Sequence, residues 1–185
     1  CGGGGSSSTS TTTATETYTV VDPYIKNATF FWDKDSDGIQ DSGEPTSTQS
    51  DSNGVFNFGS TIPPVNSKIV MKDKGEHNGI SYTGQLSATV TDSGVISPLT
   101  TFQYLYPDIN ISARLTDLGL PISNDYIDKN PLDNKNDNHI IASISIDNFL
   151  KIQQFSNVVM AEDTLTDIIA VVKSLISYDA SDANI

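Results

Sequence analysis

The sequence predicts an α+β fold, in which a small antiparallel β-sandwich is followed by a mainly helical C-terminal part. Three observations lead to this prediction. Short runs of β-branched and aromatic residues alternate with turn residues as far as Val95, apolar residues recur at helical spacing after Ser97, and a stretch almost without apolar residues precedes both. We therefore expect a flexible tether at residues 1–17, a sandwich domain at 18–96 and a helical region at 97–185.

The tether is predicted from its composition. Residues 1–17 read CGGGGSSSTSTTTATET, a mixture that cannot bury enough apolar surface to offset the entropy lost on ordering. A flexible chain of this length has a root-mean-square reach of about 20–25 Å. Cys1 is the only cysteine of the chain, so no intrachain disulfide can stabilise the fold.

Five runs in the first half are predicted strands: Tyr18–Val21, Ala28–Trp32, Val55–Phe58, Lys68–Lys72 and Ile80–Thr83. The segment Asp51–Gly54 has the sequence DSNG and is a strong turn signal, because Asn and Gly tolerate the positive φ angles of tight turns. The pair Pro63-Pro64 and the span Gly75–Gly79 mark further loops. Short strands with turns between them are typical of a small antiparallel sandwich.

Helix signals begin after the predicted sandwich. Ser97 is the predicted cap of a helix that starts at Pro98 and continues to Leu105, because proline has no N–H that would be left unpaired at a helix start. A second short helix is predicted at Asn110–Leu118, and Gly119 and Pro121 should close it.

The remaining residues also favour helices. A polar stretch, Asn124–Asn138, precedes the apolar segment His139–Phe155. After it, apolar residues recur at helical spacing, with Asp163 or Thr164 as the expected cap. The members of this last set are Leu165, Ile168, Ile169, Val172 and Ile176.

The charge of the chain excludes one class of partner. The sequence holds 23 acidic against 10 basic residues and has a formal net charge of −13, so it repels phosphate backbones and should not bind nucleic acid. The same charge repels anionic lipid headgroups, so membrane attachment requires a covalent or apolar anchor. The sequence contains no run of about 18 apolar residues, the length that spans a membrane.

The sequence lacks the motifs of the common enzyme classes. It has no G-x-S-x-G elbow, no glycine-rich phosphate loop, and no HExxH pattern around either of its histidines, His77 and His139. Both histidines are expected at the surface. No spacing singles out two carboxylates as a glycosidase pair. We therefore expect no enzymatic activity.

The most specific motif is the twelve-residue segment Asp33–Glu44, of sequence DKDSDGIQDSGE, which we call the acidic loop. Oxygen-bearing side chains occupy its first, third, fifth, ninth and twelfth positions, and Gly38 at the sixth permits a sharp turn. This is the ligand pattern of EF-hand-type calcium loops. The predicted ligands are Asp33, Asp35, Asp37, Ile39 through its carbonyl oxygen, Asp41 and Glu44.

The chemistry of the acidic loop favours Ca²⁺. Its carboxylates would repel one another without a cation, and Ca²⁺ accepts six to eight oxygen ligands in flexible geometry, whereas Mg²⁺ demands a tight octahedron. The flanks, Ala28–Trp32 and Pro45–Thr48, are rich in β-branched and aromatic residues and contain a proline. We therefore expect the ion to staple a connection between strands and not to open a pair of helices.

The first residues resemble the mature N-terminus of bacterial lipoproteins, because Cys1 is followed by a Gly- and Ser-rich stretch. In that family a signal peptidase cuts directly before a cysteine, which then carries the acyl chains. The resemblance implies lipidation of Cys1, attachment to a membrane, and a location in the bacterial cell envelope. Gly2 after the cysteine is similar to lipoproteins that are passed on to the outer membrane.

The surroundings of the acidic loop resemble a second family. Asn27–Phe30, the acidic loop with Pro45, and Ser50–Phe56 are similar to the transthyretin-like, carboxypeptidase-regulatory type β-sandwich repeats of bacterial surface proteins. In those repeats a calcium loop lies between strands and a T-D-x-x-G-x-F hairpin follows; Ser50 stands here for the threonine. The resemblance covers residues 18–95 and implies a sandwich of the immunoglobulin or transthyretin type. Ile96–Thr101 resembles the start of a helical segment in secreted bacterial proteins, for which no activity is implied.

Two weaker patterns remain open. The oxygen-rich stretch around Asp133, Asn136 and Asp137 is a candidate for another cation site, but Lys135 stands where a ligand would be expected, and a solvated linker is favoured. The second pattern is an aromatic platform for a sugar, although burial in the core is favoured for its members. These are Trp32, Tyr82, Tyr104 and Tyr106.

Together these expectations describe a non-enzymatic, calcium-stabilised, lipid-anchored structural or assembly module of the bacterial cell surface. Such a module would dock on a protein partner or assemble with further copies of itself, and exposed edge strands offer one way to do so. The alternative is an adhesion module that binds carbohydrate or another surface polymer in a calcium-dependent manner.

Overall fold

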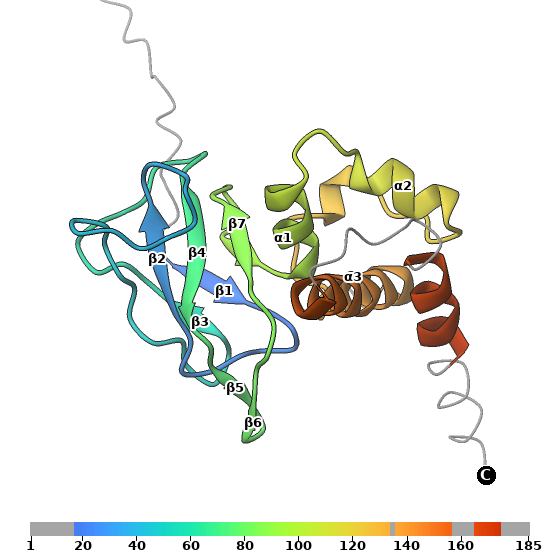
Figure 1. Cartoon of the computed structure of the whole chain (residues 1–185), viewed down its shortest axis with the longest axis horizontal. Coiled ribbons are helices and arrows are strands. Elements are labelled where there is room, and N and C mark those ends of the chain that lie inside the picture. The colour runs from blue at the N-terminus through green and yellow to red at the C-terminus, as the bar shows by residue number, and fades with distance from the viewer. Residues whose placement is uncertain (1–16, 134–135, 157–164, 175–185) are drawn as a thin grey trace, which may run out of the picture.

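The computed structural model describes residues 17–133, 136–156 and 165–174 (Figure 1). The α+β class is confirmed, because short strands come first in the chain and helices follow (Figure 1). The strands are β1 (Tyr18–Val20), β2 (Thr29–Asp33), β3 (Val55–Phe56), β4 (Lys68–Asp73), β5 (Glu76–His77), β6 (Ile80–Ser81), β7 (Ser87–Thr89) and β8 (Val95–Ile96). The helices are α1 (Pro98–Leu105), α2 (Ile111–Asp117), the 3₁₀ turn η1 (Asn124–Tyr126), α3 (Asp137–Ser156) and a helix at 165–174. We call residues 17–96 the β-rich part, and the described residues from 97 onward the helical part.

The strands form three small sheets. The first has the order β3-β1-β8, the second β2-β4-β7, and the third is the hairpin β5-β6. The five predicted runs each coincide with a strand, and no end differs by more than two residues. The predicted turn at Asp51–Gly54 is present: the Asp51 carboxylate accepts hydrogen bonds from the N–H groups of Asn53 and Val55, and Gly54 has a φ of +73°.

One strand pairing corrects the prediction of an antiparallel sandwich. β1 pairs with β3 in antiparallel fashion but with β8 in parallel fashion. Parallel neighbours require a long crossover connection, and the chain supplies one because β8 follows β1 only after all the other strands. An immunoglobulin- or transthyretin-type sandwich stays a prediction.

Three strands were not predicted from the sequence. β7 was missed although Leu86, Ala88 and Val90 alternate with polar residues and are buried in the core. β8 is only two residues long, and β5 lies within the span Gly75–Gly79 that was predicted as a loop. β5 forms because Lys26 and Glu76 exchange backbone hydrogen bonds of 2.9 Å in both directions. Gly75 is required beside this bridge, since a Cβ atom there would lie 2.1 Å from the carbonyl oxygen of Lys26.

The two three-stranded sheets bury side chains in one shared apolar core. Phe30 of β2 stacks on Phe56 of β3, with ring centroids 4.3 Å apart, and Tyr18 of β1 stacks on the same phenylalanine at 5.5 Å. Ile69 and Met71 of β4 complete the centre of this core and are 1% and 2% exposed. Burial of such side chains contributes about 1.5–3 kcal/mol each.

The opposite face of the β2-β4-β7 sheet is covered by α1. Alternation along the strands places Phe31 and Asp33 of β2 on this face, paired with Val70 and Lys68 of β4. Thr101 of α1 reaches β7 here: its hydroxyl accepts a hydrogen bond from the N–H of Ser87 and donates one to the Ser87 carbonyl, both at 3.0 Å. Figure 1 shows α1 beside β7.

The predicted start of α1 is confirmed. Ser97 caps the helix, its side chain accepts a hydrogen bond from the N–H of Thr100, and the Thr100 hydroxyl accepts one from the N–H of Ser97. Pro98 occupies the first turn, as predicted. Because β8 ends at Ile96, the chain passes from the first sheet into α1 within one residue.

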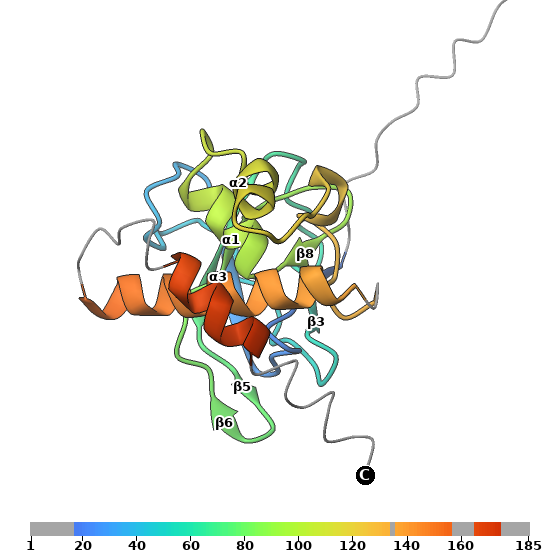
Figure 2. The ribbon, with the colours of Figure 1, turned by 90° about the vertical axis from the view of Figure 1, so that its right-hand side faces the viewer.

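The helical part has its own apolar core. α1, α2, α3 and the helix at 165–174 all contribute to it, and Figure 2 shows the last of these lying beside α3. Leu165, Ile169 and Val172, which the helical spacing singled out, are buried there. The predicted caps Asp163 and Thr164, and Ile176, lie outside the described residues. No helix within the described ranges is long and apolar enough to cross a membrane.

His139 is buried, so its predicted place at the surface is wrong. It is 0% exposed, and it packs edge-on against Tyr126 at a centroid distance of 5.7 Å. The helical period of α3 explains this, because His139 shares one face with Ala142, Ile146 and Phe149. Neither ring nitrogen has a hydrogen-bond partner among the described residues, and burial lowers the pKa of this imidazole.

Candidate metal centre

The acidic loop begins where β2 ends. Asp33 is the last residue of the strand and is only 1% exposed, because it lies on the sheet face that α1 covers. Its carboxylate is held by the loop backbone: Oδ1 accepts a hydrogen bond from the N–H of Ser36 at 2.7 Å, and Oδ2 accepts one from the N–H of Gly38 at 3.0 Å. The chain is thereby turned tightly around the first predicted ligand.

Two residues with a left-handed backbone conformation allow this turn. Ser36 has a φ of +66° and Gly38 a φ of +78°. Nothing lies within 4 Å of a Cβ atom built on Gly38, so glycine is needed there for its backbone conformation and not for lack of space. The role predicted for Gly38 is therefore consistent with its geometry.

Three predicted ligands converge. One carboxylate oxygen each from Asp33, Asp35 and Asp37 lies within 4.8 Å of the others, a separation that one cation can bridge. Asp35 and Asp37 are exposed, and each accepts a hydrogen bond from the N–H two residues later, at 3.3 and 2.7 Å. These three carboxylates are placed so that they could hold a metal ion.

The other predicted ligands lie around this group without joining it. Glu44 folds back over the loop, and its two carboxylate oxygens accept hydrogen bonds from the N–H groups of Lys34 and Asp41 at 2.5 and 3.0 Å. These bonds hold the pKa of Glu44 below its usual range, and the bond from Asp41 has the largest effect. The negative charge of Asp37 raises the pKa of Asp41, which shows that the two carboxyl groups repel each other. Ile39 is 66% exposed and its side chain carries no oxygen. Its backbone carbonyl is therefore the only metal ligand that this residue could supply.

The base of the loop is closed by the backbone. The N–H of Trp32 donates a hydrogen bond of 2.9 Å to the carbonyl of Pro45, and the N–H of Ser47 donates one of 2.8 Å to the carbonyl of Phe30. Phe31 and Thr46 also form an antiparallel bridge. The residues after the acidic loop therefore run back along β2, as expected for a connection between extended segments and not between helices.

The aromatic residues singled out in the sequence fall at two places. Tyr104 of α1 donates a long hydrogen bond of 3.5 Å to Oδ2 of Asp33, and Lys68 of β4 lies over its ring at 4.7 Å. Trp32 borders the same end of the sheet, with the Lys34 ammonium 5.0 Å from its ring centroid. Tyr82 and Tyr106 instead line a cavity beside α3. The four residues do not form a single platform.

The remaining site predictions add nothing to this centre. Among the described residues, Asp133 and Asp137 belong to no group of three metal-binding side chains, and positions 134 and 135 lie outside the description. Cys1, the predicted lipidation site, also lies outside the described residues.

Sequence reasoning missed two features. One is the contact of Tyr104 with Asp33, which depends on the docking of α1. The other is a buried polar cluster that brings Asp22 together with Tyr82, Asp147 and Lys151. The spacing of Asp147 and Lys151 on α3 is a signal for a helical ion pair, but no sequence signal connects them with Asp22, which lies far away along the chain.

Known proteins offer no template for this site. No protein family matches the chain, and no curated protein and no solved structure matches it.

Asp33 should support the fold even without a metal. In a chelator, we expect Asp33→Ala to lower the free energy of unfolding by about 1–3 kcal/mol, because the N–H groups of Ser36 and Gly38 and the Tyr104 hydroxyl lose a charged acceptor that is itself buried. The matched change Asp35→Ala, at an exposed ligand of the same loop, should cost less than about 0.5 kcal/mol. Chemical denaturation in EDTA measures both; equal losses would contradict the structural role of Asp33.

Proposed function

We propose that this protein is a non-enzymatic structural or assembly module of the bacterial cell surface, which Ca²⁺ stabilises and a lipid on Cys1 anchors. The observation that carries the proposal is the convergence of the Asp33, Asp35 and Asp37 carboxylates at the end of β2. A cation at this place would relieve the repulsion between carboxylates that Asp37 and Asp41 display.

Ca²⁺ is the proposed ion because the donor set is made of oxygen alone. Carboxylates and a backbone carbonyl are the ligands of a hard cation, and the chain has no second cysteine or nearby histidine that would favour zinc or copper. Gln40 lies beside the group, with its amide nitrogen 2.6 Å from the Thr46 hydroxyl, and gives the loop a further link to the segment after it. Asp41 and Glu44, which stand outside the group of three, would have to move to join the coordination.

The proposed role of the ion is rigidification. The acidic loop joins β2 to the segment that runs back beside it, and its first ligand, Asp33, also contacts α1 through Tyr104. An ion that binds only the folded loop adds RT ln(1+[L]/Kd) to the free energy of unfolding. The proposed sandwich of the transthyretin type is supported by the two sheets that share one core and by the loop that lies between extended segments.

The envelope location and the anchor are proposed from the sequence. Cys1 with its Gly- and Ser-rich continuation supports lipidation, and the net charge of −13 argues against attachment through anionic lipid headgroups alone.

Calcium should raise the melting temperature. We expect millimolar Ca²⁺ to add about 1–3 kcal/mol, if the affinity lies in the range of extracellular or sensor sites, and to raise Tm by about 3–10 °C over the value in EDTA. Asp37→Ala should abolish the difference, whereas the exposed control Asp108→Ala, far from the loop in sequence, should keep it. Differential scanning calorimetry gives the comparison, and identical curves of the unchanged protein with and without chelator would sink the proposal.

Lipidation is tested separately from calcium binding. The native protein should carry a mass increase of two or three acyl chains on its N-terminal cysteine and should fractionate with membranes. The variant Cys1→Ala, expressed from the natural precursor, should appear in the soluble extracellular fraction with an unchanged calcium response. An unmodified Cys1 in intact-mass spectra of the native protein would refute the anchor and leave the calcium proposal untouched.

A second candidate function is calcium-dependent binding of carbohydrate or another surface polymer. A cavity of about 310 Å³ borders the acidic loop and supports this alternative, because an aromatic ring and polar groups meet there. Its lining includes Trp32, Asp33, Lys34, Asn66 and Lys68.

A glycan array separates the two functions. An adhesion module should bind at least one glycan in Ca²⁺ and lose that binding in EDTA and in Asp37→Ala, while a purely structural module should bind none in any condition. The variant Asp108→Ala serves again as the control for the loss of one negative charge. Binding that survives EDTA would speak against the calcium-dependent form of the alternative.

A further inference from the structure

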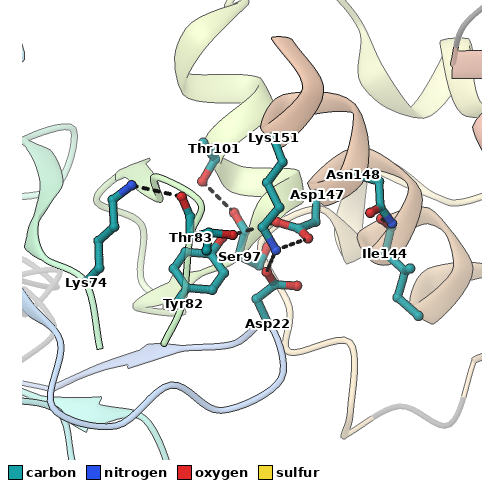
Figure 3. A network of polar contacts seen from close by, with 10 residues as sticks. All are labelled: Asp22, Lys74, Tyr82, Thr83, Ser97, Thr101, Ile144, Asp147, Asn148 and Lys151. Carbon is teal, nitrogen blue, oxygen red and sulfur yellow. Dashed lines mark hydrogen bonds and ion pairs between the residues drawn. The ribbon is translucent and has the colours of Figure 1, made fainter. Parts of the chain in front are cut away.

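A buried polar cluster joins the β-rich part to α3 at a distance from the acidic loop. It consists of Asp22, which follows β1, Tyr82, which follows β6, and Asp147 and Lys151, one turn apart on α3 (Figure 3). The Lys151 ammonium pairs with Oδ2 of Asp147 and lies 3.6 Å from Oδ2 of Asp22. The Tyr82 hydroxyl donates a hydrogen bond of 3.2 Å to Oδ1 of Asp147.

The two carboxyl groups are enclosed, while the lysine reaches the edge of the solvent. The side chains of Asp22 and Asp147 are 9% and 11% exposed, and that of Lys151 is 25% exposed. The ring of Tyr82 closes one side of the cluster, with the Lys151 ammonium 4.6 Å from its centroid. A cavity of about 330 Å³ borders Tyr82, Asp147 and Lys151 and lets water reach this side. Oδ2 of Asp22 is fully buried and has no hydrogen-bond partner among the described residues.

The charges of this cluster balance only if it holds one extra proton. Two carboxylates and one ammonium would leave a net negative charge in a largely buried site, which is costly. A proton on Asp22 makes the cluster neutral, and the protonated Asp22 can then donate a hydrogen bond to Asp147. Burial first, and then the negative charge of Asp147, raises the pKa of Asp22 to about 8, while Lys151 and Tyr82 act in the opposite direction.

We propose that Asp22, Tyr82, Asp147 and Lys151 form a proton-dependent latch, which holds α3 against the β-rich part while one proton is shared between the two carboxyl groups and loosens α3 when that proton leaves. Three ionisable groups act on the pKa of the Asp22 carboxyl group: Asp147 and Lys151 face it from α3, and Tyr82 faces it from the segment after β6. The latch is independent of the acidic loop.

The direction of the pH effect follows from proton binding. Detached from α3, Asp22 would have an ordinary pKa near 4, so between pH 4 and about pH 8 the docked state holds a proton that the loosened state lacks. The stabilisation from this proton is complete below about pH 4 and is lost as the pH rises towards 8. Alkaline conditions should therefore loosen α3 while leaving α1 docked, because α1 is attached to β7 through the uncharged pair Ser87 and Thr101.

Hydrogen exchange tests the latch on the whole chain. With EDTA present throughout, we expect the protection factors of α3 to fall roughly tenfold or more between pH 6 and pH 9, relative to those of α1 and β4, since each pH unit between the two pKa values changes the equilibrium about tenfold. Asp22→Asn imitates the protonated form and should abolish the difference. Asp108→Asn, the same change at an exposed position, should retain it. The proposal would be overturned if the protection of α3 in the wild-type protein were the same at pH 6 and pH 9. It would also be overturned if Asp22→Asn lost as much α3 protection between these pH values as the wild-type protein.

Two further measurements keep the proposal falsifiable if Asp22→Asn folds poorly. The carboxyl carbon resonance of Asp22 in the unchanged protein should titrate with a midpoint close to the pH at which the fall in α3 protection levels off, and a midpoint below pH 5 would exclude a latch. Lys151→Gln removes the positive charge that favours ionisation of Asp22, so the protection of α3 should level off at a higher pH. Levelling off at the same pH in that variant would also contradict the proposed cluster.

Discussion

The buried carboxylate of Asp33 is the interaction on which the arrangement of the acidic loop depends. The period of two along β2 puts this residue on the face covered by α1, while its neighbour Trp32 points towards the core shared by the sheets. The same carboxylate turns the loop through the N–H groups of Ser36 and Gly38 and accepts a hydrogen bond from Tyr104. One side chain thus links a strand end, a candidate metal centre and a helix.

The two halves of the chain have separate apolar cores but meet through polar groups. One core draws its members from the strands and their connections, and the other from α1 onward. Between them lie the hydrogen bonds of Ser87 with Thr101, of Tyr24 with Asn130 and of Tyr82 with Asp147. Directional bonds of this kind fix a relative position, whereas apolar contact alone tolerates sliding.

Local signals in the sequence predicted local structure well. Ser97 and Pro98 start α1 and Gly38 turns the acidic loop because caps and tight turns are determined within a few residues. β8 and its parallel pairing with β1 were missed because pairing depends on contacts between residues far apart in the chain. The surface position predicted for His139 is wrong because the helical period that it shares with Ile146 places it on the buried face of α3, whatever the polarity of its imidazole. Asp22 carried no signal at all, because only the docking of α3 makes it a buried acid.

The position of β1 has a mechanical consequence. This first strand is the middle strand of its sheet, with β3 on one side and β8 on the other. A pulling force that enters at Tyr18 would therefore have to shear two rows of backbone hydrogen bonds together, and could not peel the strand away from an edge one bond at a time. Since β8 continues directly into α1, the load would also pass to the helices, so that both cores resist extension from the N-terminal side.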